Sequence, residues 1–207
     1  MTGKGSLNHN SRKFHAKNTD PNRTHWNVEY CNEDIKDVYH ELFDEALKRY
    51  NDKQTRKDRK IDDYYEKIRS GKQEKLFHEV ILQIGDKDNM GSETMEGQLA
   101  AKILDEYMKG FQERNPTLRV FAAHLHLDEA TPHLHIDFIP YVTGSKRGLD
   151  TRVSLKQALS SLGFKGGSRS ETELNQWVQS EKEKLAMVMR ENEIEWDQKG
   201  THERSEE

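Results

Sequence analysis

The chain has 207 residues and a formal net charge of −4 at pH 7, which is enough length for one sizeable domain and a small appendage. Only 32% of its residues are hydrophobic, and no stretch approaches the roughly eighteen apolar residues of a membrane span or the apolar region of a signal peptide. The single cysteine, Cys31, excludes an internal disulfide and suits a reducing compartment, so we expect a cytoplasmic protein.

Charge is distributed unevenly along the chain. Residues 1–25 carry five Lys/Arg against Asp20 alone, residues 53–72 carry eight against four acids, and residues 171–207 carry eleven acids against five bases. Local potential rather than net charge governs phosphate binding, so an acidic chain can still bind DNA. We expect the first basic segment, which is short of apolar side chains, to be mobile until DNA orders it. The second fits a solvated helix surface and a DNA contact equally well.

Hydrophobic periodicity alternates between helical and extended spacing along the chain. Asn32 and Ser92 are the side chains expected to cap the first and third helices, because a short polar side chain can accept from free amides. The run 76–84 is β-rich, with six apolar residues among nine, as in a strand buried on both faces or nearly so. The expected elements are helix 33–50, helix 55–70, strand 76–84, helix 93–111, strands 118–127 and 133–142, a short helix near 154–162 and a long helix over 171–193.

The segment from His124 to Asp137 carries four of the ten histidines. Side chains alternate faces along a strand, so two strands joined by the polar loop 128–132 would gather these histidines on one surface. The opposite surface is apolar and would meet the helix over 93–111, which predicts an α+β fold: a mainly antiparallel sheet with helices packed on one face. The polar surface carries His124, His126, His133, His135 and Asp137, and the apolar one carries Leu125, Leu127, Leu134, Ile136 and Phe138.

Imidazoles gathered on one surface would repel one another when charged and would leave buried nitrogens unpaired when neutral, unless they bind something. The pattern therefore predicts a divalent metal site on this face of the sheet. Three imidazole ligands leave coordination positions open, which is typical of a catalytic rather than a structural site. Zinc, manganese, cobalt and nickel all accept imidazole, so the residues alone leave the element open.

Two stretches carry a resemblance to a known family. The run 126–135 (HLDEATPHLH) resembles the metal motif of the Mob/Pre plasmid mobilisation relaxases, the MobV type of the HUH endonucleases. Residues 8–12 (NHNSR) and 18–27 (NTDPNRTHWN) resemble the N-terminal HNxR motif of that family and the element after it. The resemblance spans roughly 5–165 and implies the HUH-type α+β fold. It suggests a relaxase catalytic domain over 1–165 and a C-terminal helical extension over 166–207, after which we would expect further helical sequence.

The resemblance implies a DNA relaxase that nicks one strand at a plasmid or mobile-element origin of transfer, stays linked to the 5′ phosphate and so starts conjugative mobilisation. It also implies three metal ligands, with His124 beside the metal rather than on it. Manganese is the foremost ion, and magnesium, zinc, cobalt and nickel are alternatives. The implied ligands are His126, His133 and His135.

The histidine of the HNxR motif, His9, is the nucleophile that the resemblance implies, and it would form a phosphoramidate. Arg12 could hold a phosphate oxygen with its fork of donors. Glu129, next to the metal face, could act as a general base or orient a histidine, and Asp137 could hydrogen-bond a ligand imidazole. The competing nucleophiles are Tyr30, Tyr64 and Tyr65.

DNA of the origin, single-stranded or as a hairpin, is the expected partner, together with a conjugation coupling protein; the sequence does not define an oligomeric state. Trp26 could stack on a base, but burial in the core is the more common role of a tryptophan and is the favoured interpretation here. The alternatives are a rolling-circle replication initiator on the same fold, a metal-dependent hydrolase that uses bound water, and a non-catalytic DNA-binding regulator. The expected DNA-binding residues are Lys4, Asn10, Arg12, Lys13, Arg23 and Trp26.

Overall fold

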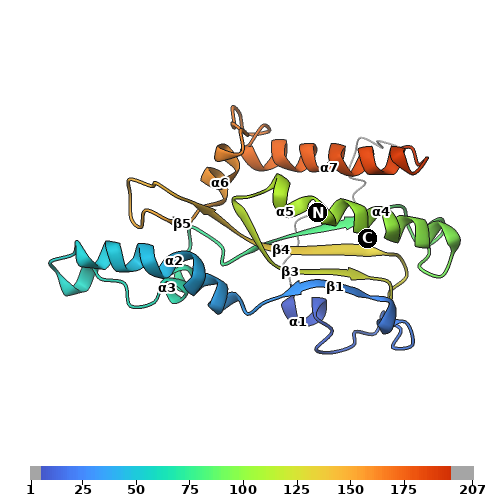
Figure 1. The fold of residues 1–207 in the computed structure, drawn as a ribbon, viewed down its shortest axis with the longest axis horizontal. Helices are drawn as coiled ribbons and strands as arrows, with labels where there is room; N and C mark the ends of the chain where they lie inside the picture. The colour runs from blue at the N-terminus through green and yellow to red at the C-terminus, as the bar shows by residue number, and fades with distance from the viewer. Residues whose placement is uncertain (1–5, 197–207) are drawn as a thin grey trace.

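The computed structural model describes residues 6–196, and its centre is an antiparallel sheet in the order β1-β3-β4-β2, with β5 paired to the far end of β4 (Figure 1). This confirms the predicted α+β architecture. The strands are β1 (Val28–Asn32), β2 (His78–Gln83), β3 (Leu118–His126), β4 (His133–Val142) and β5 (Arg152–Val153). The helices are α1 (Leu7–Asn10), α2 (Ile35–Asp52), α3 (Tyr64–Ser70), α4 (Met95–Lys109), α5 (Phe111–Arg114), α6 (Leu155–Ser161) and α7 (Glu173–Glu191), with 3-10 turns at Thr24–Trp26 and Lys57–Arg59.

The apolar face of the sheet packs on α4, α5, α6 and α7, as the alternation of β3 and β4 predicts. Leu134 and Ile136 of β4 are fully buried there. Trp177, on α7, is 1% exposed and belongs to the same core, so this late helix packs on the domain rather than apart from it. No helix within residues 6–196 is long and apolar enough to cross a membrane.

A second apolar cluster, which the sequence did not predict, lies on the histidine face at the other end of the sheet. Ile139 follows Asp137 by two residues on β4, so both side chains lie on the same face. Phe121 and Ile139 pack there against α2 and α3, whose Phe43 and Tyr64 are buried in this cluster. Helices therefore cover part of the histidine face and leave the end nearest the β3–β4 loop for the N-terminal segment.

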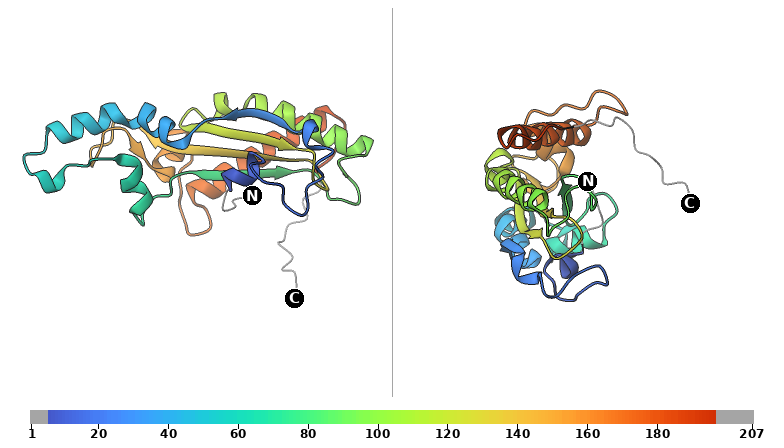
Figure 2. Two further views of the ribbon diagram at one scale, coloured as in Figure 1. Left: turned by 90° about the horizontal axis from the view of Figure 1, so that it is seen from below. Right: turned by 90° about the vertical axis from the view of Figure 1, so that its right-hand side faces the viewer.

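Residues 6–25 lie across this remaining part of the histidine face, with α1 on the opposite side of the sheet from α4 (Figure 2). The amide of Asp20 donates to the carbonyl of Asp128 at 2.7 Å, and Asn10 is only 2% exposed. The described part of this segment therefore has defined contacts with distant parts of the chain: the hairpin loop is the partner of Asp20, and Glu79 and Asp137 are the partners of Asn10. The mobility of the segment without DNA stays a prediction.

Two helix starts differ from the expected ones. Asp34, not Asn32, caps α2 by accepting from the amide of Lys36, because β1 continues to Asn32. Thr94, not Ser92, caps α4, since the Ser92 hydroxyl donates instead to a carbonyl of the β3–β4 loop.

Three further elements differ from the expectation. The helix expected over 55–70 is reduced to a 3-10 turn and the short α3, and the amide side chain of Asn51 pairs with the backbone of Ile61 between them. The helix expected over 93–111 is interrupted at Gly110. Strands β1 and β5 were not predicted; both are short, and β1 carries a register shift between Glu29 and Cys31.

Candidate functional site

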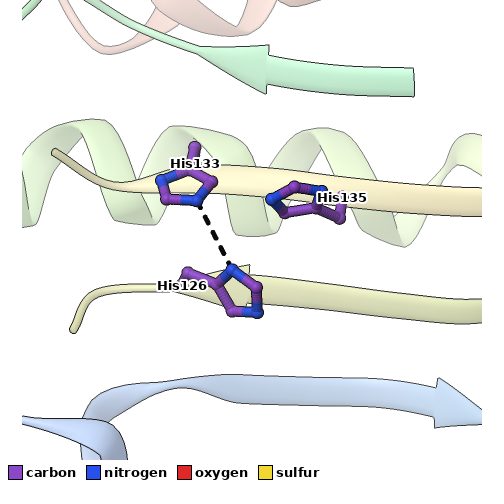
Figure 3. Close-up of side chains that lie close together, drawn as sticks. All are labelled: His126, His133 and His135. Atoms are coloured by element: carbon purple, nitrogen blue, oxygen red, sulfur yellow. Dashed lines mark hydrogen bonds between the residues drawn. The ribbon is translucent and has the colours of Figure 1, made fainter. Parts of the chain in front are cut away.

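The β3–β4 hairpin brings the three predicted ligand histidines together. His126 lies opposite His133 in the register of the two strands, and His135 is two residues further along β4. The three ring centroids are 4.9 to 5.2 Å apart, and each ring contributes one nitrogen to a group whose atoms all lie within 4.8 Å of one another (Figure 3). All three side chains are buried. The structure therefore confirms that the strand alternation gathers these rings.

Hydrogen bonds at the outer nitrogens determine which nitrogen of each ring carries the proton. His126 Nε2 lies 2.9 Å from the carbonyl of Asn10, and His133 Nδ1 lies 2.9 Å from the carbonyl of Thr131. A carbonyl oxygen can only accept, so both of these nitrogens donate. The inner nitrogens, His126 Nδ1 and His133 Nε2, then carry lone pairs and face each other at 3.4 Å. Two ligands about 2.1 Å from one ion lie at roughly this separation.

His135 completes the group through a carboxylate. Its Nδ1 donates to Glu79 Oε1 at 2.7 Å, and its Nε2 is buried without a hydrogen-bond partner among the described residues. A buried nitrogen without a partner is costly unless it binds a ligand. The three ring nitrogens that carry lone pairs therefore point into one space, and each ring is oriented by a hydrogen-bond acceptor at its other nitrogen. This arrangement fits a divalent cation.

Burial favours the neutral form of His126 and His135, which is the form that binds metal. Burial, with the positive charge of Arg12 as the second cause, lowers the pKa of His126 to about 3. Burial also lowers the pKa of His135, and the nearby Glu79 carboxylate opposes that shift only in part. His124 is buried on the same face with a lowered pKa but lies outside the ligand group, as expected.

Glu79 is the site residue that sequence reasoning missed. It lies on β2, opposite Asp137 of β4, and its Oε1 accepts from Asn10 as well as from His135. Asp137, which we expected to hydrogen-bond a ligand imidazole, accepts instead from Asn10 at 3.0 Å. The signal available in the sequence was an acid directly before the apolar run 80–82 of this strand.

The N-terminal helix places His9 over the metal face. The Ser6 side chain caps α1 by accepting from the amide of His9, and the ring of His9 lies 6.0 Å from that of His126 and 6.3 Å from that of His135. His9 Nε2 is 3.3 Å from Glu129 Oε1. The two predicted catalytic residues are therefore in contact, and both lie beside the ligand group.

Arg12 joins this contact to the hairpin loop. Its backbone is in the left-handed region (φ 51°), which non-glycine residues adopt rarely, and its side chain turns back toward the loop. Its guanidinium donates to both oxygens of Asp128, at 2.9 and 2.5 Å, and to Glu129 at 2.8 Å. A further nitrogen of the same group lies 3.2 Å from His9 Nε2. The donors expected to hold a phosphate thus have protein partners.

Glu129 is ionised in this environment. Burial raises its pKa, but its neighbours, His133 when that ring carries a proton and Arg12, outweigh burial and lower the pKa to about 2. Its other oxygen accepts from Asn18 at 2.6 Å. The carboxylate therefore stays ionised and can accept a hydrogen bond from His9 across the working pH range. It also belongs, with His9 and His126, to a second group that could hold a metal.

Some of the expected DNA-binding residues are exposed in the structure, and others already have protein partners. Lys4 lies outside the described residues. Asn10 is buried and donates to Glu79 and Asp137, which leaves its amide without access to DNA. Arg23 donates to two loop carbonyls. The exposed members are Lys13 and Trp26, the latter 38% exposed rather than buried in the core.

The three tyrosines that could replace His9 as nucleophile lie outside the histidine group. Tyr30 donates to Asp105 on α4 at 2.8 Å, and burial together with this hydrogen bond raises its pKa far above the usual value. Tyr64 and Tyr65 belong to the apolar cluster of α2 and α3. Their positions are those of packing residues.

Comparison with known proteins agrees with this geometry. A family model described as plasmid recombination enzyme (Mob_Pre) matches residues 5–192, which corrects our expectation that the resemblance ends near 165. Two Mn-bound crystal structures of the MobM relaxase domain (MOBV; Mob_Pre) with 22 nucleotides of plasmid pMV158 oriT DNA match with TM-scores of 0.51 and 0.52. They are 23% and 22% identical, over 96% and 97% of this chain and 86% of each relaxase chain, and they show the same fold. No curated protein matches the chain in sequence.

Proposed function

Because the chain belongs to the Mob_Pre family of plasmid recombination enzymes, we propose that it is a relaxase: a metal-dependent enzyme that nicks one DNA strand at an origin of transfer. The observation that carries this proposal is the contact between His9 and Glu129 beside three inward-facing ring nitrogens. A nucleophile, a carboxylate that accepts from it and a cation site are the parts that phosphoryl transfer needs. The relatives that share the fold are bound to oriT DNA and to manganese, which supports DNA and Mn²⁺ as the partner and cofactor here.

We assign the ligand role to His126, His133 and His135. A bound divalent ion would withdraw charge from the scissile phosphate and leave positions open for its oxygens. Glu79 orients His135 by accepting from its outer nitrogen, and the same carboxylate oxygen anchors Asn10, the neighbour of His9. This single carboxylate therefore links the segment that carries the nucleophile to a ligand ring.

We assign the attack to His9. The lone pair of one nitrogen of the neutral His9 ring forms a bond to phosphorus, the bond from phosphorus to the 3′ oxygen breaks, and that oxygen leaves with the electron pair and takes up a proton from water. The other ring nitrogen releases its proton to the solvent, so that the phosphorylated ring is neutral. The product is a 5′-phosphohistidine link and a free 3′ hydroxyl. Because the phosphoramidate keeps the energy of the broken ester, the strand can be rejoined without another energy source.

Arg12 and Glu129 hold His9 in place for this step. Arg12 stands within 3.2 Å of His9 Nε2 and also donates to its backbone carbonyl at 3.0 Å. Glu129 contacts both residues. Because the guanidinium already has carboxylate partners, we assign Arg12 the role of positioning His9, in addition to any contact with the phosphate. A coupling protein as a further partner stays a prediction.

The test compares His9→Ala with His15→Ala, an exposed histidine of the same segment. Each variant is incubated with Mn²⁺ and a supercoiled plasmid that carries the origin of the host element. We expect the wild type and His15→Ala to relax the plasmid and form a protein–DNA adduct that acid cleaves and base does not. His9→Ala should bind DNA and Mn²⁺ but form no adduct.

Other outcomes separate the alternatives. An acid-stable adduct on a tyrosine would refute His9 as the nucleophile. Cleavage without any adduct would instead indicate a metal-dependent hydrolase that uses bound water. Origin binding that needs neither metal nor His9, with no cleavage, would indicate a regulator.

A further inference from the structure

A cavity of about 460 Å³ lies between α3 and the edge strand β2, and of its lining residues only Glu79 has a role in the proposed reaction. Its wall includes Glu79, the same residue that holds His135 and Asn10, so the cavity and the histidine group share this side chain. Phe77 also lines it, two residues before Glu79 and on the same face of the sheet. The volume falls within the range of small-ligand pockets.

Charge is arranged in a definite order across this cavity. Glu79 is 4% exposed and lies at the buried end, whereas Arg69 and Lys75 line the cavity with exposed side chains. Glu74, half-buried, is the other acid in the wall, and Arg69 pairs with Glu66 at the surface. Such an exposed pair is weak and can exchange for a phosphate.

A carboxylate at the buried end disfavours an anion there, while the exposed cations attract one. The same cavity offers an aromatic ring and the aliphatic side chain of Ile68. A ligand with an apolar ring and an anionic group fits this arrangement of charge. Its ring would lie in the buried part of the cavity, and its anionic group would lie at the rim beside the exposed cations. A nucleotide has this distribution of charge, and nucleobases stack on aromatic side chains in single-strand binding sites.

We propose that this cavity, the α3–β2 pocket, binds one nucleobase of the single strand held at the metal centre, with the adjoining phosphate on Arg69 and Lys75. The pocket lies at the end of the basic segment 53–72, whose exposed Lys67 and Lys72 continue the positive surface beyond it. This inference rests on the proposed function, because the strand reaches the pocket from the scissile phosphate. In this proposal the basic segment 53–72 binds the DNA single strand on its way to the pocket.

The test uses a fluorescent oligo(dT) of about twenty nucleotides with Mn²⁺ and three variants of the full chain. Phe77→Leu keeps an apolar side chain against the core but removes the ring, and should weaken binding about 5- to 100-fold. Lys75→Gln should reduce the slope of log affinity against log salt by about 0.7, as expected for one lost phosphate contact on a single strand. Lys184→Gln, an exposed lysine of α7, is the matched control and should change neither value.

A second measurement does not depend on how well the variants fold. An oligo(dT) that carries 5-iodouracil should crosslink to Phe77 of the wild type on irradiation. Crosslinks confined to other residues, or Phe77→Leu and Lys75→Gln proteins that bind as the wild type does, would overturn the pocket and leave the proposed relaxase standing. A wild type that does not bind single-stranded DNA at low salt would overturn both.

Discussion

Arg12 and Asp128, which are 116 residues apart in the chain, form a two-point ion pair in which the carboxylate is fully buried and the guanidinium is 8% exposed. The pair fastens the segment that carries His9 to the loop between the two strands of the histidine hairpin. A buried pair of this kind contributes little over an apolar pair, but removing one partner leaves the other charge uncompensated.

We predict that Arg12→Gln lowers the free energy of unfolding by about 3–5 kcal/mol, because it leaves the buried charge of Asp128 without its partner. Asp128→Asn should lower it by less, because Arg12 keeps its ion pair with Glu129. The double variant should lose less than the sum, with a coupling energy of about 1–3 kcal/mol. Urea unfolding at neutral pH measures all four values. Additive losses would show that the two side chains do not stabilise each other.

Metal binding should depend on the three ligand rings and not on the neighbouring histidine. Mn²⁺ at a hundred times its dissociation constant should stabilise the wild type by about 2.7 kcal/mol, seen as a rise in melting temperature. His126→Ala, His133→Ala and His135→Ala should each lose most of this rise. His124→Ala is the control, since His124 is equally buried on the same face but lies outside the group. Loss of the rise in the control alone would place the metal elsewhere.

Trp26 should report on DNA binding because its ring is exposed beside the site. We expect single-stranded DNA to quench tryptophan fluorescence, and Trp26→Phe to remove most of this quenching while keeping the affinity within a few fold. Trp26→Ala should lower the affinity by about 1–3 kcal/mol through the lost stacking. Full quenching in Trp26→Phe would assign the signal to another tryptophan.

His78 should make the stability of the protein sensitive to acid. Burial, with the charge of Lys75 as a smaller cause, lowers the pKa of His78 to about 4 in the folded chain, whereas an unfolded histidine titrates near 6.5. The unfolded chain therefore binds more protons between these values, so this stabilisation is complete above about pH 6.5 and is lost as the pH falls toward 4. From pH 7.5 to 5 the loss from this residue is about 2 kcal/mol.

His78→Leu should remove that part of the acid sensitivity in urea unfolding at the two pH values. The control is His40→Gln: His40 is exposed, and its hydrogen bond to Asp44 raises its pKa, so its contribution has the opposite sign. An unchanged pH dependence in His78→Leu would mean that the pKa of His78 is the same in the folded and the unfolded chain, so that the folded protein is protonated at His78 at pH 5.

The sequence by itself determined that the four histidines share one surface, because they lie on adjacent strands of one hairpin, and the family resemblance selected three of them as ligands. Alternation with a period of two places such side chains on one face whatever the rest of the fold does. The same local rule placed the apolar face and therefore the layer of α4. Side chains within ten residues of one another can be assigned to a common surface from spacing alone.

Only the tertiary structure decided which residues hydrogen-bond to those rings and which segment of the chain packs over them. Glu79 reaches His135 from 56 residues away, and Asn10 reaches Asp137 from 127. No periodicity links such positions, since their meeting depends on the strand order that puts β2 beside β4 and on the path that brings α1 across the sheet. The second apolar cluster was not predicted for the same reason. The strand pattern does not say that α1 packs on one end of this sheet face and α2 on the other. Local spacing therefore specifies a surface, and long-range packing specifies what that surface contacts.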